Sequence, residues 1–216
     1  MNDSLKDLFF ASYISRGELV YRNDRIELIN YFNKEKAYFL YNYIESNGLE
    51  KYIRINSKNS KMTIVVDQNC KDQETLIMLF LGTLTLKSPK VLDFISLHTA
   101  LVLINLFGQR KVEGISVNTH LHAEKQKILS HVLSKRLNTL VVPTKNHLLL
   151  PYIRELVIEN LPKCEIVNAL ELANYMTKSE INELNKNHSA WEVSHETPLD
   201  EFNDPGFPYH YFELLQ

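Results

Sequence analysis

Two histidines and a carboxylate stand close together in the middle of the chain, and their types could support metal chemistry. His120 and His122 are two residues apart, and Glu124 follows them. On a strand this spacing places two imidazoles on one side, as a zinc site would need. No cysteine or further histidine follows at a recognised ligand spacing. The pattern therefore favours solvated histidines near the start of a helix, and no metal site is expected.

The rest of the sequence offers no local signature of catalysis. Ser-His-acid and Cys-His mechanisms need side chains that meet in space, and no nucleophile elbow or similar motif selects such residues here. The 6 glycines form no phosphate-binding loop. We therefore expect no enzyme of these classes and no cofactor.

Basic and acidic residues are distributed unevenly along the 216-residue chain. Residues 190–216 contain six acidic residues and no Lys or Arg, which leaves 24 basic and 20 acidic residues in the first 189. This small positive surplus permits contacts with nucleic-acid phosphates but does not establish them, because a strongly basic face is the usual footprint. The acidic tail is rich in proline and aromatic residues, so we expect it to be irregular and to lie against the body of the chain or a protein neighbour.

Composition indicates a globular protein in which no segment spans a membrane. Hydrophobic residues make up 44% of the chain and charged residues 23%, which is an ordinary balance. The apolar stretch 97–107 is interrupted by His98, Thr99 and Asn105 and is shorter than a bilayer-spanning helix. The abundance of Asn, Lys, Ile and Leu is typical of an AT-biased gene and favours a mitochondrion or another organelle, with the cytoplasm as the alternative.

Hydrophobic spacing and turn residues predict a first unit of six elements. The unit is a helix, two strands, a helix and two strands, at residues 5–15, 18–23, 25–31, 34–46, 51–56 and 61–66. Gly17 is expected to end the first helix with a positive φ. Asn33 is expected to cap the second helix, which ends at Asn47 and Gly48.

A second unit with the same order follows a mostly helical connection at residues 73–88. Pro89 is expected in the first turn of a helix that runs on through residues 97–106 and ends at Gly108. The later elements are expected at residues 109–118, 121–137, 139–142, 147–149 and 151–159. A further helix starts at a capping box formed by Thr177 and Glu180. The sequence thus predicts an α+β protein with parts at 1–72, 73–162 and 163–216.

This duplicated order, in which each unit opens on an apolar helix that ends in glycine, resembles the two-repeat LAGLIDADG family of homing endonucleases and intron maturases. Residues 9–17 (FFASYISRG) and 100–108 (ALVLINLFG) occupy the places of the family's nine-residue motif. Residues 18–28 and 114–129 resemble the strands and the helix that follow it. The resemblance implies two pseudo-symmetric αββαββα repeats with a curved antiparallel sheet, a C-terminal helix and an irregular tail.

The resemblance covers roughly residues 5–160 and implies a protein without nuclease activity. In the family, the acidic residue before the final glycine of each motif binds the divalent metal ion. The corresponding positions here are Arg16 and Phe107, and neither supplies the oxygen ligands that Mg²⁺ requires. Arg16 is then either a surface charge at a helix C-terminus or a ligand for a phosphate.

In the family, the face of the sheet that carries no helix holds the nucleic acid. Because side chains alternate along a strand, Arg25 and Arg54 are expected on that face if Ile26 and Ile53 are buried. An ordinary solvated sheet face is the alternative. The residues expected to bind nucleic acid are Arg16, Arg22, Arg25, Tyr52, Arg54, Lys58, Lys61, Arg110, Lys111, Ser116, Asn118 and Lys145.

The function that the resemblance implies is the binding of structured RNA, as a maturase-like intron splicing factor or as a component of an organellar ribonucleoprotein such as a ribosome. The tail at 190–216 would then contact protein neighbours. A DNA-binding regulator on the same fold is one alternative. An active divalent-metal endonuclease with relocated ligands, at Asp24, Asp67 or Asp93, is another.

Overall fold

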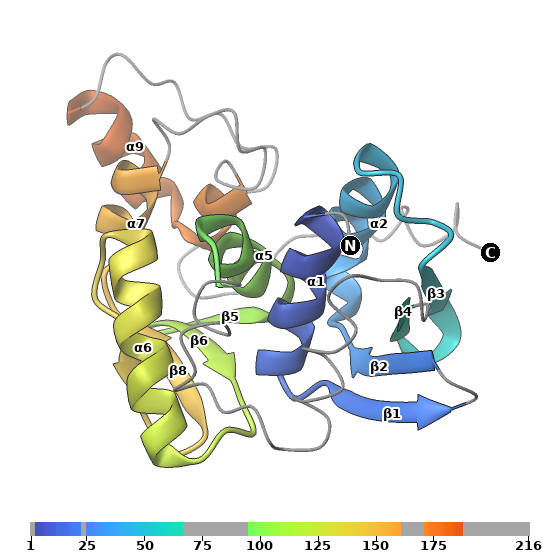
Figure 1. Cartoon of the computed structure of the whole chain (residues 1–216). Coiled ribbons are helices and arrows are strands. Elements are labelled where there is room, and N and C mark those ends of the chain that lie inside the picture. Colours follow the sequence, from blue (N-terminus) through green and yellow to red (C-terminus); the bar gives the residue numbers. More distant parts are fainter. Residues whose placement is uncertain (1–2, 23–24, 67–94, 161–170, 188–216) are drawn as a thin grey trace.

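The computed structural model describes residues 3–22, 25–66, 95–160 and 171–187 (Figure 1). These residues form six α-helices and two four-stranded antiparallel sheets, so the predicted α+β class is confirmed. The predicted boundaries at 72/73 and 162/163, the helical stretch 73–88 and the tail 190–216 lie outside the described residues. None of the described helices is long and apolar enough to cross a lipid bilayer.

The first sheet, sheet A, follows helix α1 (Asp3–Ile14). The later elements of this unit are β1 (Glu18–Arg22), β2 (Arg25–Tyr31), η1 (Lys34–Lys36), α2 (Ala37–Ser46), β3 (Ile53–Asn56), η2 (Ser57–Asn59) and β4 (Lys61–Val66). The strands lie in the order β1-β2-β4-β3. The sequence predicts this order of helices and strands, but the structure adds a turn of 3₁₀ helix, capped by Asn33, before α2.

The second sheet, sheet B, follows helix α5 (Leu97–Phe107). The later elements are β5 (Gly108–Lys111), β6 (Gly114–Asn118), α6 (Ala123–Leu137), β7 (Val142–Pro143), β8 (His147–Leu150), α7 (Ile153–Asn160), η4 (Glu171–Tyr175) and α9 (Lys178–Asn187). The strands lie in the order β5-β6-β8-β7, which is the order of sheet A. The predicted capping box of α9 is present, because Thr177 N–H donates to Glu180 Oε2 (2.7 Å) and Glu180 N–H donates to Thr177 Oγ1 (3.3 Å).

Helix α5 begins at Leu97, so the expectation that this helix starts at Pro89 is wrong. Ser96 is its N-cap in an extended conformation. Ser96 Oγ accepts from Thr99 N–H (2.9 Å), and Thr99 Oγ1 accepts from Ser96 N–H (3.2 Å). This pair of bonds satisfies two of the N–H groups that a helix start leaves free. Pro89 itself lies outside the described residues.

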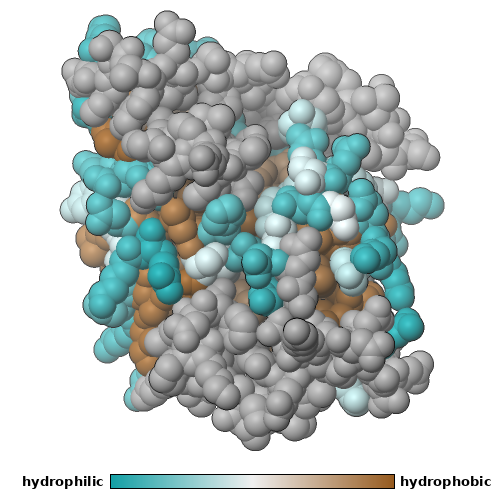
Figure 2. Space-filling model, turned by 45° about the horizontal axis from the view of Figure 1, so that its top comes forward, coloured by the Kyte–Doolittle hydropathy of each residue, from teal (hydrophilic) through white to brown (hydrophobic). Residues whose placement is uncertain are grey.

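Helices α1 and α5 stand side by side at the centre of the molecule (Figure 1), where they pack against each other. Helix α1 also packs on β2, and α5 on β6. Leu8 and Leu101 in these helices have no exposed surface, and one hydrophobic cluster joins both units with the segment 171–187. On the side seen in Figure 2, hydrophilic side chains lie along both flanks and across the middle, and hydrophobic ones show between these groups. The shared core therefore fixes how the two sheets lie relative to each other.

The C-terminal end of α1 differs from the expectation that Gly17 adopts a positive φ. The left-handed residue is Arg16, with φ of 63°. Gly17 is needed for a different reason, because a Cβ there would lie 2.5 Å from Ser12 O and 2.8 Å from Leu28 Cδ1. The buried Asn30 of β2 donates through Nδ2 to Ser12 O and Ser15 O, both at 2.9 Å. The helix end is thus held tightly against sheet A.

The C-terminal end of α5 is held by a residue from far along the chain. Tyr175 of η4 is buried, and its hydroxyl donates to Ile104 O at 2.6 Å. In sheet B, Gly108 pairs with Val117. In sheet A, extension of the β1–β2 register by one residue would set Gly17 opposite Asn30. Val117 occupies the place of Asn30 but has no donor in its side chain. The C-terminal segment therefore supplies the hydrogen bond that the sheet supplies in the first unit.

Candidate nucleic-acid interface

The cations of sheet A lie on the face that is turned away from α1. Register aligns Ile29 with Thr63 and Arg54, and Tyr31 with Lys61 and Asn56. The alternate residues Ile26, Leu28 and Ile64 are fully buried beneath the helices. Side chains alternate along each strand, so Arg25, Arg54 and Lys61 share the opposite face, which we call the open face of sheet A. Arg22 is the register partner of Arg25.

Two carboxylates, Glu18 and Glu27, share the open face of sheet A with the cations. Arg54 Nη1 lies 3.9 Å from Glu27 Oε1. The Arg54 side chain is 66% exposed, and an ion pair in such a position contributes at most about 1 kcal/mol. Glu27 therefore orients the guanidinium while leaving it available to a phosphate.

An exposed tyrosine that was not among the predicted residues lies on the same face. Tyr31 is 62% exposed and is aligned in register with Lys61 and Asn56. An aromatic ring beside a cation can stack on an unpaired base while the cation contacts the phosphate. The alternation that placed Arg25 on this face also applies to Tyr31, six residues later on the same strand, and could have identified it.

The corresponding open face of sheet B carries fewer exposed polar groups. Ser116 and Asn118 alternate with the fully buried Ile115 and Val117, as the sequence predicts. Ser116 is only 8% exposed, so it offers little surface to a ligand. Asn118 and Lys111 are exposed on this face.

Arg110 lies on the other side of sheet B. It is the register partner of the buried Ile115, so its side chain shares the helix-bearing face. Its Nη2 donates to Glu180 Oε1 of α9 at 3.4 Å, and the side chain is 15% exposed. We therefore leave Arg110 out of the interface, because it joins strand β5 to α9.

Two other predicted residues lie at the edge of sheet A. Tyr52 is half-buried against the core, with Lys51 Nζ 4.7 Å from the centre of its ring. Lys58 is exposed in η2, and its N–H donates to Asn56 Oδ1 (3.1 Å). Lys58 therefore extends the basic surface, whereas Tyr52 presents only part of its ring.

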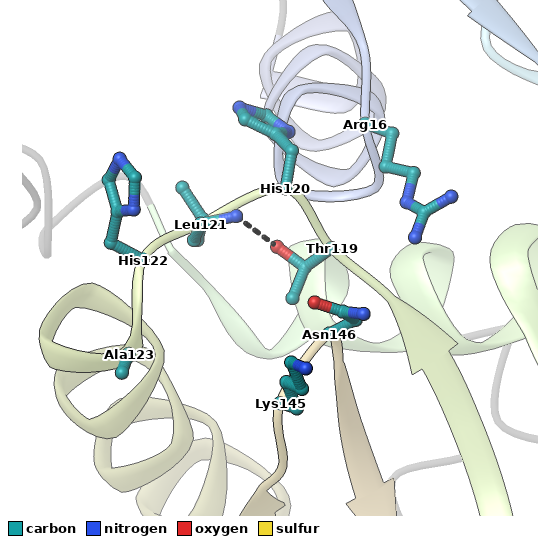
Figure 3. Close-up of a pocket in the computed structure, with 8 residues that line it drawn as sticks. All are labelled: Arg16, Thr119, His120, Leu121, His122, Ala123, Lys145 and Asn146. Atoms are coloured by element: carbon teal, nitrogen blue, oxygen red, sulfur yellow. Dashed lines mark hydrogen bonds between the residues drawn. The ribbon is translucent and has the colours of Figure 1, made fainter.

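Arg16 and Lys145, far apart in sequence, line one pocket of about 580 Å³ (Figure 3). The pocket lies between the C-terminal end of α1, the connection from β6 to α6 and the turn from β7 to β8. Its lining residues are Arg16, Thr119, His120, Leu121, His122, Ala123, Lys145 and Asn146. The sequence favours solvated histidines at positions 120 and 122, and no local pattern links them to Arg16.

The backbone around the pocket is held by the buried side chain of Gln126. Its Nε2 donates to Leu121 O at 2.6 Å and lies 3.4 Å from Lys145 O. His120 packs edge-on against Tyr13, with ring centres 5.6 Å apart. In the part of the chain that the structure describes, no three His, Cys, Asp or Glu side chains come together as metal ligands.

Lowering the pH is expected to destabilise the chain slightly through His120. Partial burial, followed by the positive charges of Lys125, Arg16 and His122, lowers the pKa of His120 below its ordinary value of 6.5. The unfolded chain therefore binds this proton at a higher pH than the folded chain. Stability is unaffected above pH 6.5 and falls as the pH drops toward the lowered pKa.

The measurement is the free energy of unfolding at a series of pH values, for the wild-type chain and for His120→Gln. The wild-type value should fall more steeply below pH 6.5. Because the ring is partly exposed, the difference is small. If the free energy of unfolding falls equally steeply in the wild-type chain and in His120→Gln, His120 has the same pKa in the folded and unfolded states.

Comparisons of this chain with models of protein families, with curated proteins and with solved structures find no match in any of the three. The function of the chain is therefore inferred from its own residues.

Proposed function

We propose that this chain is a non-catalytic protein of the LAGLIDADG type that binds structured RNA across the open faces of its two sheets. Three structural features support the family assignment. Both sheets have the same strand order, each follows a helix that leads into a glycine, and those two helices pack against each other. Such a duplicated arrangement is what the resemblance of residues 9–17 and 100–108 implies.

The absence of catalysis follows from the two positions where the family carries its metal-binding acids. Arg16 is exposed at the end of α1, and Phe107 ends α5 and packs partly against the core. A guanidinium repels Mg²⁺, and a phenyl ring offers it no oxygen. The carboxylates that a relocated site would use, at Asp24, Asp67 and Asp93, lie outside the described residues.

Cations and hydrogen-bonding side chains lie together on the open faces of the sheets, and this observation carries the proposal. Register sets Arg54 and Lys61 on the open face of sheet A beside Asn56, and Lys111 lies on the open face of sheet B. Cations position phosphates, and amide side chains contact bases or sugars. In Figure 1, β1 and β2 lie below α1, and β5 and β6 lie below α5, so we expect one ligand to contact both sheets.

RNA is favoured over duplex DNA for two reasons. Few cations face outward, whereas unassisted binding to a duplex scales with the number of phosphates neutralised. The exposed ring of Tyr31 suits unpaired bases, which structured RNA presents in loops and bulges. An intron or the RNA of an organellar ribonucleoprotein has this chemistry.

The test begins with crosslinking of the full-length protein in its native cells and sequencing of the attached nucleic acid. The RNA recovered is then titrated with the purified chain. Arg54→Gln combined with Lys61→Gln should weaken binding about 100-fold, since a hydrogen bond to a charged group contributes about 1.5–3 kcal/mol. Each lost phosphate contact should also reduce the slope of log affinity against log salt by about 0.7.

The matched control is Lys135→Gln combined with Lys186→Gln, which removes the same charge from exposed positions on α6 and α9. This variant should bind as the wild-type chain does. Equal losses in both variants would mean that net charge, and not the open face, drives binding. Recovery of DNA alone would favour a DNA-binding regulator and would overturn the proposal.

A further inference from the structure

The charged side chains that line the pocket in Figure 3 are all basic. It contains two cations, Arg16 and Lys145, and two histidines, with no carboxylate. Within the described residues, neither cation forms an ion pair with an acid. Glu18 and Glu124 are the acids nearest in sequence to Arg16 and His122, and neither is part of the lining. The pocket thus attracts anions and offers several donors to hold one.

The first turn of α6 adds backbone donors on the same side. Its N-cap, His122, makes no capping hydrogen bond with its side chain. The N–H groups at the start of this 15-residue helix are consequently not satisfied by a side-chain cap, and the helix dipole adds partial positive charge there. His122 and Ala123 line the pocket, so the N-terminal end of α6 borders it.

The lowered pKa of His120 is a consequence of burial and of the same positive charges. After burial, the causes that lower its pKa are the charges of Lys125, Arg16 and His122, all of them positive. Three cationic groups from two separate segments therefore act on one ring at the pocket wall. A bound anion would offset them.

We propose that this pocket binds a phosphate group, and that the phosphate is a backbone phosphodiester of the strand that crosses from sheet A to sheet B. Arg16 supplies a planar set of N–H donors, Lys145 a single mobile charge, and the start of α6 backbone N–H groups. A volume of about 580 Å³ leaves room for the sugar attached to the phosphate. The identity of the ligand as part of an RNA strand rests on the proposed function, whereas the phosphate site itself does not.

The experiment follows the ring C–H signals of His120 and His122 by NMR in the full-length chain. The probes are inorganic phosphate, a 5′-mononucleotide and a dinucleoside monophosphate, with chloride at equal ionic strength as the control. Each phosphate probe should move both signals saturably and raise the titration midpoint of His120. Absence of a saturable change with all three probes would overturn the phosphate site.

Variants then identify the ligand groups. Arg16→Gly removes the charge at a residue with φ of 63°, where glycine is the least strained residue, so the fold is retained. Arg16→Gly and Lys145→Gln should each weaken probe binding about tenfold, the loss expected for one charge-assisted hydrogen bond. Lys135→Gln removes a charge at the other end of α6 and should change nothing. Binding that is unchanged in both pocket variants would overturn the proposal.

The source of the phosphate is decided by the RNA titration. If the strand supplies it, the dinucleoside monophosphate binds more tightly than inorganic phosphate, and both pocket variants weaken RNA binding. If the mononucleotide binds and RNA affinity is unchanged in the variants, the pocket is a site for a free phosphomonoester and the strand assignment fails. A third outcome is that RNA binding depends on Arg54 and Lys61 while none of the probes binds in the pocket. That result would leave the proposed function intact and would remove only the phosphate site.

Discussion

Replacement of Gly108 by alanine is expected to lower the free energy of unfolding by about 3 kcal/mol, which corresponds to a fall of roughly 10 °C in melting temperature. A Cβ at this position would collide with the main-chain oxygen of Ile104. It would also lie 2.8 Å from Tyr175 Oη and 2.9 Å from Ile115 Cγ2. Relief of the collision requires either the helix end or sheet B to shift. Urea and thermal unfolding of the full chain measure the effect.

The cost has two parts that can be separated, the collision itself and the loss of the hydrogen bond from Tyr175 to Ile104 O (2.6 Å). In a Tyr175→Phe background that bond is already absent, so Gly108→Ala should cost less there than in the wild-type chain. Gly48→Ala is the matched control. Gly48 has a φ of 61° and no atom within 4 Å of its added Cβ, so this change costs only about 1 kcal/mol of backbone strain. A loss at Gly108 no larger than that at Gly48 would contradict the packing argument.

The strands of sheet A and their faces could be predicted from the sequence because one face is buried. Alternation between Ile26, Leu28 and the residues beside them fixes which side chains meet the helices, and a shift by one residue would reverse every one of them. The limits expected for Arg25–Tyr31 and Lys61–Val66 agree with the structure for the same reason. The open face therefore follows from local pattern alone.

Features that depend on distant segments could not be predicted. The side of Arg110 is set by the pairing of a four-residue strand with β6, and no alternation extends over so short a segment. The hydroxyl of Tyr175 meets a helix end 71 residues away. The pocket joins Arg16 to residues more than one hundred positions later. Each depends on tertiary packing, for which a single sequence carries no local signal.

Asp7 is the second position where a single change is expected to have a large effect. Its carboxylate is 7% exposed and accepts from Ser96 Oγ at 2.7 Å and Thr99 Oγ1 at 2.5 Å. These bonds join α1 to the first turn of α5, where a negative charge is also favoured by the helix dipole. Asp7→Ala leaves the buried Thr99 hydroxyl and the half-buried Ser96 hydroxyl without this acceptor and should cost about 3 kcal/mol. Equilibrium unfolding in urea measures the loss.

Asp3→Ala provides the comparison within the same helix. The Asp3 side chain is 94% exposed, and its ion pair with Lys6 (3.3 Å) should contribute less than about 1 kcal/mol. If Asp7→Ala costs no more than Asp3→Ala, the buried carboxylate does not hold the two units together. Thr99→Val, which removes one of the two donors and the capping bond to Ser96, should lose much of its effect once Asp7 is already alanine. Hydrogen exchange should then be faster at the start of α5 in either variant, because the same cluster secures that helix start and its contact with α1.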